Sequence, residues 1–86
     1  MMQPHLVSST EDVEIVQMTG ESLVLRNKCA LRETEITVGG LAKSGWTLAV
    51  DREEGKVIPG QSGFIDFKIP AGRSATIRRS SSGVLQ

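Results

Sequence analysis

Several residue types are scarce in this chain of 86 residues, and each shortage excludes a class of protein or site. The single cysteine, Cys29, excludes an internal disulfide and any zinc site built on paired cysteines. The single histidine, His5, has no second metal ligand or catalytic base near it in the sequence. The formal net charge is zero, so long-range electrostatics select neither nucleic acid nor a basic partner.

Long hydrophobic runs are also missing. Residues 1–5 contain no apolar core of signal-peptide length, and no segment approaches the length of a transmembrane helix. Together with the lone cysteine, this pattern predicts an intracellular protein, in the cytoplasm or the nucleus, with no membrane partner.

Aromatic residues are the third shortage, since the chain has one tryptophan, two phenylalanines and no tyrosine. A chain this short forms one domain at most and buries roughly 60% of the surface that its unfolded form exposes. Val, Ile and Leu supply most of the remaining large apolar side chains. We expect a thin two-layer core and no deep catalytic cleft.

The segment 45–51 contains the only tryptophan, and the rest of the chain is expected to be organised around it. Trp46, Leu48 and Val50 alternate with other residues, which places them on one face of a strand. A tryptophan side chain buries roughly 200 Å². We therefore expect Trp46 to mark the place where the two halves of the core meet.

Strand-like segments recur about every ten residues, and no helix-length pattern of period 3.6 is present. These segments are 13–18, 22–27, 33–38, 46–51, 57–58, 64–69 and 74–79. They predict an all-β fold, either a small antiparallel β-sandwich of the immunoglobulin-like kind or a partly open barrel of about six to seven strands.

The expected organisation is a flexible arm at 1–12, a single β-domain at 13–79 and a flexible tail at 80–86. Alternation of apolar residues along the strands predicts which side chains form the core. Its expected members are Leu23, Leu25, Ile36, Val38, Trp46, Leu48, Ile65, Phe67, Ile69 and Ile77. Phe64 falls on the opposite, polar face of its strand.

The first strand-like segment changes parity, because Val13 and Ile15 share one face while Val16 and Met18 share the other. Either a β-bulge near Ile15 and Val16 or a strand buried on both faces explains this change.

Turns are expected between the strand-like segments. Gly20 would take a positive φ in a short hairpin, and Asn27 would begin a turn because it tolerates left-handed backbone. Residues 39–45 form a long flexible connection, and residues 52–56 an acidic turn.

No set of residues points to catalysis. Residues 40–47 have the glycine spacing of a phosphate-binding loop, but Trp46 stands where that motif needs lysine, so a flexible connection is favoured. Cys29 has no sequence neighbours that lower its pKa, and a passive thiol is expected. Since no base, nucleophile and metal set is present, we predict no enzyme activity, no cofactor and no metal site.

Basic residues cluster in two parts of the sequence. Arg26, Lys28, Arg78 and Arg79 would form one basic edge if the second and last strands flank the same sheet. Such an edge could bind phosphate or an acidic peptide. The favoured alternative is that acidic residues offset solvated cations, namely Glu21, Glu33 and Glu35.

Residues 13–28, which include Leu23-Val24-Leu25-Arg26-Asn27, resemble the opening of the lamin-tail domain, the immunoglobulin-like module in the tails of nuclear lamins. Residues 36–38 with 45–48, and residues 67–77, are similar to later strands of that family. The resemblance implies an immunoglobulin-like fold and a role in protein or nucleic-acid binding and assembly, and it implies no catalytic residues.

Two functional hypotheses follow. The first is a non-catalytic module that binds a protein partner, with weak nucleic-acid binding also open, through Arg26, Lys28, Arg78, Arg79 and Phe64. The second is a small structural subunit that self-associates through its sheet edges, because open edges in so short a chain favour a partner.

Overall fold

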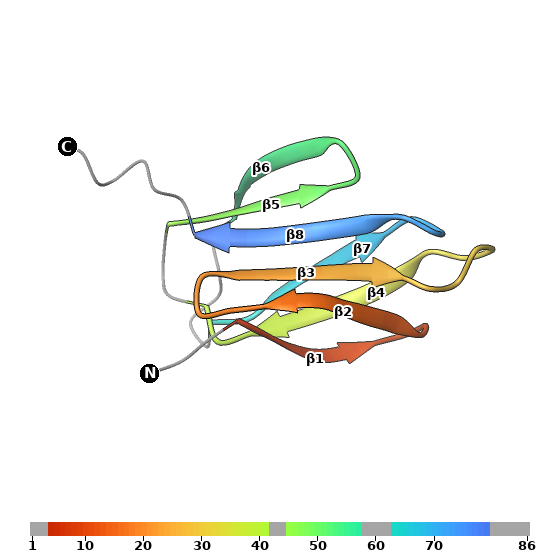
Figure 1. Cartoon of the computed structure of the whole chain (residues 1–86), viewed down its shortest axis with the longest axis horizontal. Coiled ribbons are helices and arrows are strands. Elements are labelled where there is room, and N and C mark those ends of the chain that lie inside the picture. Colours follow the sequence, from red (N-terminus) through yellow and green to blue (C-terminus); the bar gives the residue numbers. More distant parts are fainter. Residues whose placement is uncertain (1–3, 42–44, 58–62, 80–86) are drawn as a thin grey trace.

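The computed structural model describes residues 4–41, 45–57 and 63–79, and these residues form eight strands and no helix (Figure 1). The strands are β1 (His5–Ser9), β2 (Val13–Met18), β3 (Ser22–Asn27), β4 (Thr34–Gly39), β5 (Trp46–Val50), β6 (Glu53–Val57), β7 (Ile65–Ile69) and β8 (Ser74–Arg79). The prediction of an all-β fold is confirmed.

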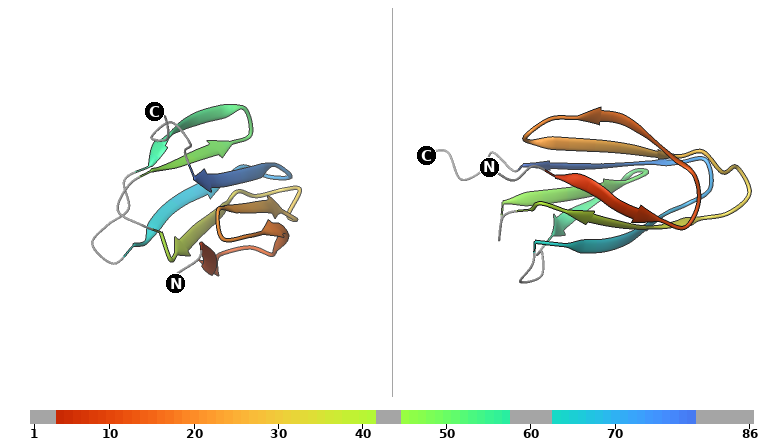
Figure 2. Two further views of the ribbon diagram at one scale, coloured as in Figure 1. Left: turned by 60° about the vertical axis from the view of Figure 1, so that its left-hand side comes forward. Right: turned by 90° about the horizontal axis from the view of Figure 1, so that it is seen from below.

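The strands form two antiparallel sheets that face each other as two layers (Figure 2). The larger sheet has the order β2-β3-β8-β5-β6, and the smaller has the order β1-β4-β7. Neither sheet closes on itself, so the fold is a small β-sandwich rather than a barrel. Four strands are sheet edges: β1, β2, β6 and β7.

The core lies between the two layers and matches the predicted set closely. Its buried apolar members are Leu23, Leu25, Ile36, Val38, Leu41, Trp46, Ile65, Ile69, Ala75 and Ile77. Leu48 and Phe67 were also expected, and both are half-buried against this cluster. Ala75 and Leu41 are buried but absent from the predicted list. The N–H of Leu41 donates to the carbonyl of Gly63 at 3.1 Å, which fixes the start of the predicted flexible connection.

The prediction of a loose arm at residues 1–12 differs from the structure. Residues 5–9 form β1, which pairs with β4 from His5 opposite Gly39 to Ser9 opposite Ile36. Pro4 is fully buried, and Leu6 packs against the core. The apolar pattern of this segment is too short to predict a strand, and its pairing with β4 cannot be read from the segment alone. Residues 1–3 and the predicted tail at 80–86 lie outside the described residues.

The predicted acidic turn at 52–56 is also different, because residues 53–57 form β6. Val50 pairs with Glu53, so the turn between β5 and β6 consists of Asp51 and Arg52 alone. Asp51 has a φ of 57°, a left-handed conformation that aspartate tolerates better than most residues. Its N–H donates to the carbonyl of Ser74 at 2.9 Å, which anchors the turn to β8.

The predicted bulge in β2 is confirmed. The pairing of β2 with β3 shifts between Ile15 and Gln17, which leaves Val16 as the extra residue. The alternative of burial on both faces is wrong, because Ile15, Val16 and Met18 are each about half exposed. A second bulge lies in β1, between Leu6 and Ser8.

The hairpin turn between β2 and β3 is confirmed, but Gly20 does not take the expected positive φ. The hydroxyl of Thr19 accepts hydrogen bonds from the N–H groups of Glu21 and Ser22 at 3.1 and 3.0 Å. A side-chain acceptor of this kind closes a turn without left-handed backbone.

Asn27 also acts differently from the prediction, since it has no positive φ and is 1% exposed. Its side-chain nitrogen lies 2.8, 3.1 and 3.2 Å from the carbonyl oxygens of Arg32, Ile69 and Pro70. Its side-chain oxygen accepts a hydrogen bond from the N–H of Cys29 at 2.9 Å. Asn27 therefore organises its turn through its side chain.

Candidate interaction surfaces

The four predicted basic residues do not form one edge. β3 and β8 are neighbours in the larger sheet, as the prediction required, but Arg26 is opposite Ser74 while Arg78 is opposite Ser22. An offset of four residues corresponds to about 13 Å along the ladder. Lys28 follows Arg26 beyond the end of β3. The antiparallel register therefore puts the two pairs of cations at opposite ends of the sheet.

Each cation at the first end has an acidic neighbour. Arg26 lies directly opposite Glu14, and its Nη2 is 2.8 Å from Glu14 Oε1. Lys28 Nζ is 3.8 Å from Asp12 Oδ2. These side chains are about half exposed or more, so the ion pairs contribute little to stability but do offset the positive charge.

The cations at the other end are engaged as well. Arg78 Nη2 is 3.0 Å from Glu54 Oε2. The guanidinium of Arg79 lies over the indole ring of Trp46, 5.2 Å from its centroid. The indole face attracts the cation, and the arginine side chain lies over that face.

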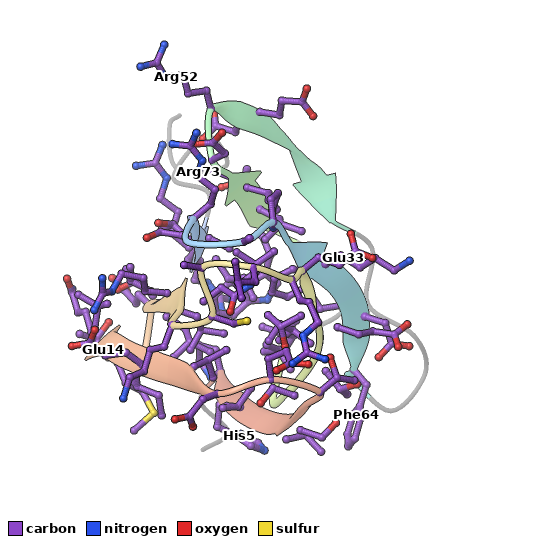
Figure 3. The ribbon with its side chains drawn as sticks, turned by 90° about the vertical axis from the view of Figure 1, so that its right-hand side faces the viewer. His5, Glu14, Glu33, Arg52, Phe64 and Arg73 are labelled. Carbon is purple, nitrogen blue, oxygen red and sulfur yellow. The ribbon has the colours of Figure 1, made fainter. Side chains whose placement is uncertain are left out.

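Charge compensation, which the sequence favours, describes three of these four cations, although their acidic partners are not the expected ones. Of the three acidic residues predicted, Glu33 does form an ion pair, with Lys68 at 3.5 Å. The end of the sandwich seen in Figure 3 carries further pairs, including Arg73 with Asp51 at 3.9 Å. Positive and negative groups alternate around this end and do not gather into a patch of one sign.

Phe64 occupies the exposed position that the sequence predicts. Its side chain lies on the outer face of the smaller sheet and is 45% exposed. A Cβ placed on Gly39 would lie 3.1 Å from Val7 Cγ2, 3.3 Å from Phe64 Cε1 and 3.3 Å from His5 Nε2. Three side chains therefore meet above a residue that has none. Figure 3 shows His5 and Phe64 on the same side of the sandwich, near β1.

We call this group of Phe64, Val7 and His5 above Gly39 the Phe64 patch. Val7 is 46% exposed, so the patch offers an aromatic ring and an aliphatic side chain to a partner. Gly39 creates the patch because any larger residue would lift the three side chains away from the sheet. Val7 and His5 fall in the segment expected to be a loose arm, so their place beside Phe64 could not be read from the sequence.

Most of the exposed large apolar side chains gather on one side of the molecule. Val7 of β1 and Ile15, Val16 and Met18 of β2 account for four of the six in the described residues. Leu31 is the most exposed, at 88%, and lies in the turn between β3 and β4. The β1 and β2 edges therefore form the least polar side of the sandwich.

The described residues contain no cluster of three or more His, Cys, Asp or Glu side chains that could hold a metal ion. The pKa of the Cys29 thiol lies below its ordinary value. A hydrogen bond from the backbone of Leu31 lowers that pKa, and the backbone and side chain of Arg32 lower it further. Partial desolvation and the charge of Glu11 act in the opposite direction.

No helix in the described part of the chain is long and apolar enough to cross a membrane. No protein-family model, curated protein or solved structure matches the chain.

Proposed function

We propose that this domain is a non-catalytic interaction module that binds a protein partner through the Phe64 patch. The observation that carries the proposal is the meeting of Phe64 and Val7 above Gly39, each about half exposed. Aromatic side chains presented on a rigid sheet are typical anchors of protein interfaces. A β-sandwich with eight strands holds them in place at little entropic cost on binding.

A protein partner fits the surface better than nucleic acid does. Nucleic-acid binding needs several cations free to neutralise phosphates, and the predicted basic residues are instead divided between two ends and held by acidic or aromatic neighbours. Weak, salt-sensitive binding to nucleic acid is what such a surface would support. An intracellular location remains the prediction from the lone cysteine.

The resemblance to the lamin-tail domain agrees with a binding role, but the strand order departs from the immunoglobulin pattern. In the A-B-E-D sheet of that pattern, strand E lies between strands B and D. Strand E also follows strand D directly in the sequence. Here the strand between β3 and β5 is β8, which comes after β6 and β7. The proposal therefore rests on the Phe64 patch and not on the resemblance.

The experiment compares the intact domain with two substitutions of exposed apolar residues. Phe64→Ser removes the aromatic anchor, and Leu31→Ser is the matched control at the opposite end of the sandwich. Immobilised protein would capture partners from an extract of the native host, and each captured protein would then be purified and titrated calorimetrically. We expect Phe64→Ser to weaken binding at least about tenfold, since a central aromatic anchor is worth 2 kcal/mol or more.

A partner that binds the wild type and Phe64→Ser equally well contradicts the proposal. Loss of binding in both variants also contradicts it, because that result would point to a general surface effect. Circular dichroism of each variant would verify that the β-sandwich is intact before binding is compared.

A further inference from the structure

We propose that the free edge of β1 is a homodimer interface, at which β1 pairs antiparallel with β1 of a second copy about a two-fold axis. The two smaller sheets would then form one six-stranded sheet, and Ile15 and Met18 of β2 would pack over the junction. The free edge of β1 is a different surface from the exposed ring of Phe64, although Val7 borders both, and the dimer does not depend on the proposed function.

The first argument is the orientation of two side chains on β2. Ile15 pairs with Leu25, and Met18 pairs with Leu23, so both share the core-facing side of the larger sheet. Leu23 and Leu25 are fully buried, yet Ile15 is 47% and Met18 is 52% exposed. The smaller sheet therefore ends before it covers them. One more strand beyond β1 would supply the missing cover.

The second argument is the accessibility of the edge. β1 is the outermost strand on its side of the molecule, and the view from below shows no other described strand in front of it (Figures 1 and 2). On the opposite side, β5 and β6 of the larger sheet extend past β7 (Figure 1). A new strand can therefore approach β1 more easily than it can approach β7.

Charge separates β1 from the other edge strands. Charged side chains on an edge strand discourage its pairing with another strand, because pairing would bring them close to a second chain and partly remove them from water. Every other edge strand carries such residues: β2 has Glu14, β6 has Glu53, Glu54 and Lys56, and β7 has Asp66 and Lys68. β1, with the sequence His-Leu-Val-Ser-Ser, has no permanently charged side chain.

The exposed apolar side chains of β2 select a second copy as the occupant. A second copy brings its own Ile15 and Met18, which lack cover in the same way, so one two-fold contact buries both sets. If β1 of one copy pairs with β1 of the other over all five residues, the middle residue, Val7, lies at the two-fold axis. The bulge at Val7 limits the number of backbone bonds, which favours a dimer that forms and dissociates over a permanent one.

The test uses opposite charges at the axis. Val7→Lys and Val7→Glu each place two like charges at the junction, and each should raise the dissociation constant of the dimer at least about tenfold. A mixture of the two variants places lysine opposite glutamate, so heterodimers should form. Sedimentation velocity over about a hundredfold range of concentration should show wild type rising from the 9.3 kDa monomer toward twice that mass.

Leu31→Lys is the matched control, because it adds the same charge to an exposed apolar position in the turn between β3 and β4, outside β1. It should leave the association of the wild type unchanged. Met18→Ser should weaken association without adding charge. In the wild type, exchange of the β1 backbone amides with solvent should slow as the protein concentration rises. If the Val7 variants fail to fold, the same charges at the neighbouring exposed Ser8 provide the equivalent pair.

A wild type that stays monomeric over the whole range overturns the inference, even if β1 binds a different protein. A dimer that survives Val7→Lys also overturns it, because the contact would then lie elsewhere. Folded Val7→Lys and Val7→Glu variants that remain monomeric when mixed would show that β1 does not face itself across the axis.

Discussion

The side-chain amide of Asn27 donates a hydrogen bond of 3.1 Å to the backbone carbonyl of Ile69, and this bond joins the two layers of the sandwich. Asn27 ends β3 of the larger sheet, whereas Ile69 ends β7 of the smaller one. Both residues are almost fully buried. A polar contact inside a small apolar core fixes how the layers align, because sliding either sheet would break the bond between the Asn27 amide and the Ile69 carbonyl.

Replacing Asn27 with Ala should therefore destabilise the domain. The substitution leaves the carbonyl of Ile69 without this partner in a buried site, and an unsatisfied buried group costs about 1–3 kcal/mol. Urea unfolding followed by Trp46 fluorescence would measure the loss. Gln17→Ala, which removes an exposed side-chain bond to Ser22 of 3.3 Å, should change the free energy of unfolding by less than about 0.5 kcal/mol. Equal effects of the two substitutions would contradict the role assigned to Asn27.

Trp46 should be the most costly single side chain to remove. It is 3% exposed and packs within the core, so Trp46→Ala should cost about 3–5 kcal/mol. A domain of this size has a total stability of about 5–15 kcal/mol, so this variant would be partly or wholly unfolded at room temperature. Circular dichroism melting curves would show it. Arg79→Ala removes only the cation above the ring, and its cost should stay near 1 kcal/mol. A Trp46→Ala variant with normal stability would place the centre of the core elsewhere.

The parts of the fold that sequence predicts are those in which side chains alternate. Leu23 and Leu25 are two residues apart on β3, and both are fully buried, because period-two spacing assigns a strand residue to one face whatever its neighbours are. The bulge in β2 was predictable for the same reason, since an extra residue reverses parity at Val16. Core membership and local irregularity are both properties of a single strand.

Features that depend on pairing between strands were not predictable in this way. Backbone bonds to β4 hold β1, whose own side chains give almost no apolar pattern. The basic edge failed because strand order and register decide where Arg26 and Arg78 lie, and neither can be read from one strand alone. The Phe64 patch needs Val7 and Phe64 to meet above Gly39, although these residues are far apart in the sequence.

Gly39 should control the geometry of the Phe64 patch with little effect on stability. Gly39→Ala places a Cβ within 3.1–3.3 Å of atoms on Val7, Phe64 and His5, and these flexible side chains must move outward. Losing a strand glycine favours folding by roughly 0.5–1 kcal/mol, which offsets part of the crowding. Nuclear Overhauser contacts between the Phe64 ring and the Val7 methyl groups should weaken.

The matched control for Gly39 is Gly55→Ala in β6, where a new Cβ meets no atom within 4 Å. It should leave the contacts of Phe64 unchanged. If Gly39→Ala also leaves them unchanged, the glycine does not determine how the patch is arranged.

The last prediction concerns Cys29, whose thiol pKa is lowered mainly by the backbone hydrogen bond from Leu31. Because the folded pKa lies below the unfolded one, the thiolate should form at a lower pH in the native domain than in urea. The rate of alkylation by iodoacetamide should therefore reach half its maximum at a lower pH in the folded protein. By linkage, this contribution to stability is fully present above the unfolded pKa and is lost as the pH falls through the folded pKa. Arg32→Gln removes a secondary donor and should move the alkylation midpoint upward, while Arg52→Gln, a charge-matched control, should leave it in place. Identical midpoints in the native and unfolded protein would show that the turn does not stabilise the thiolate.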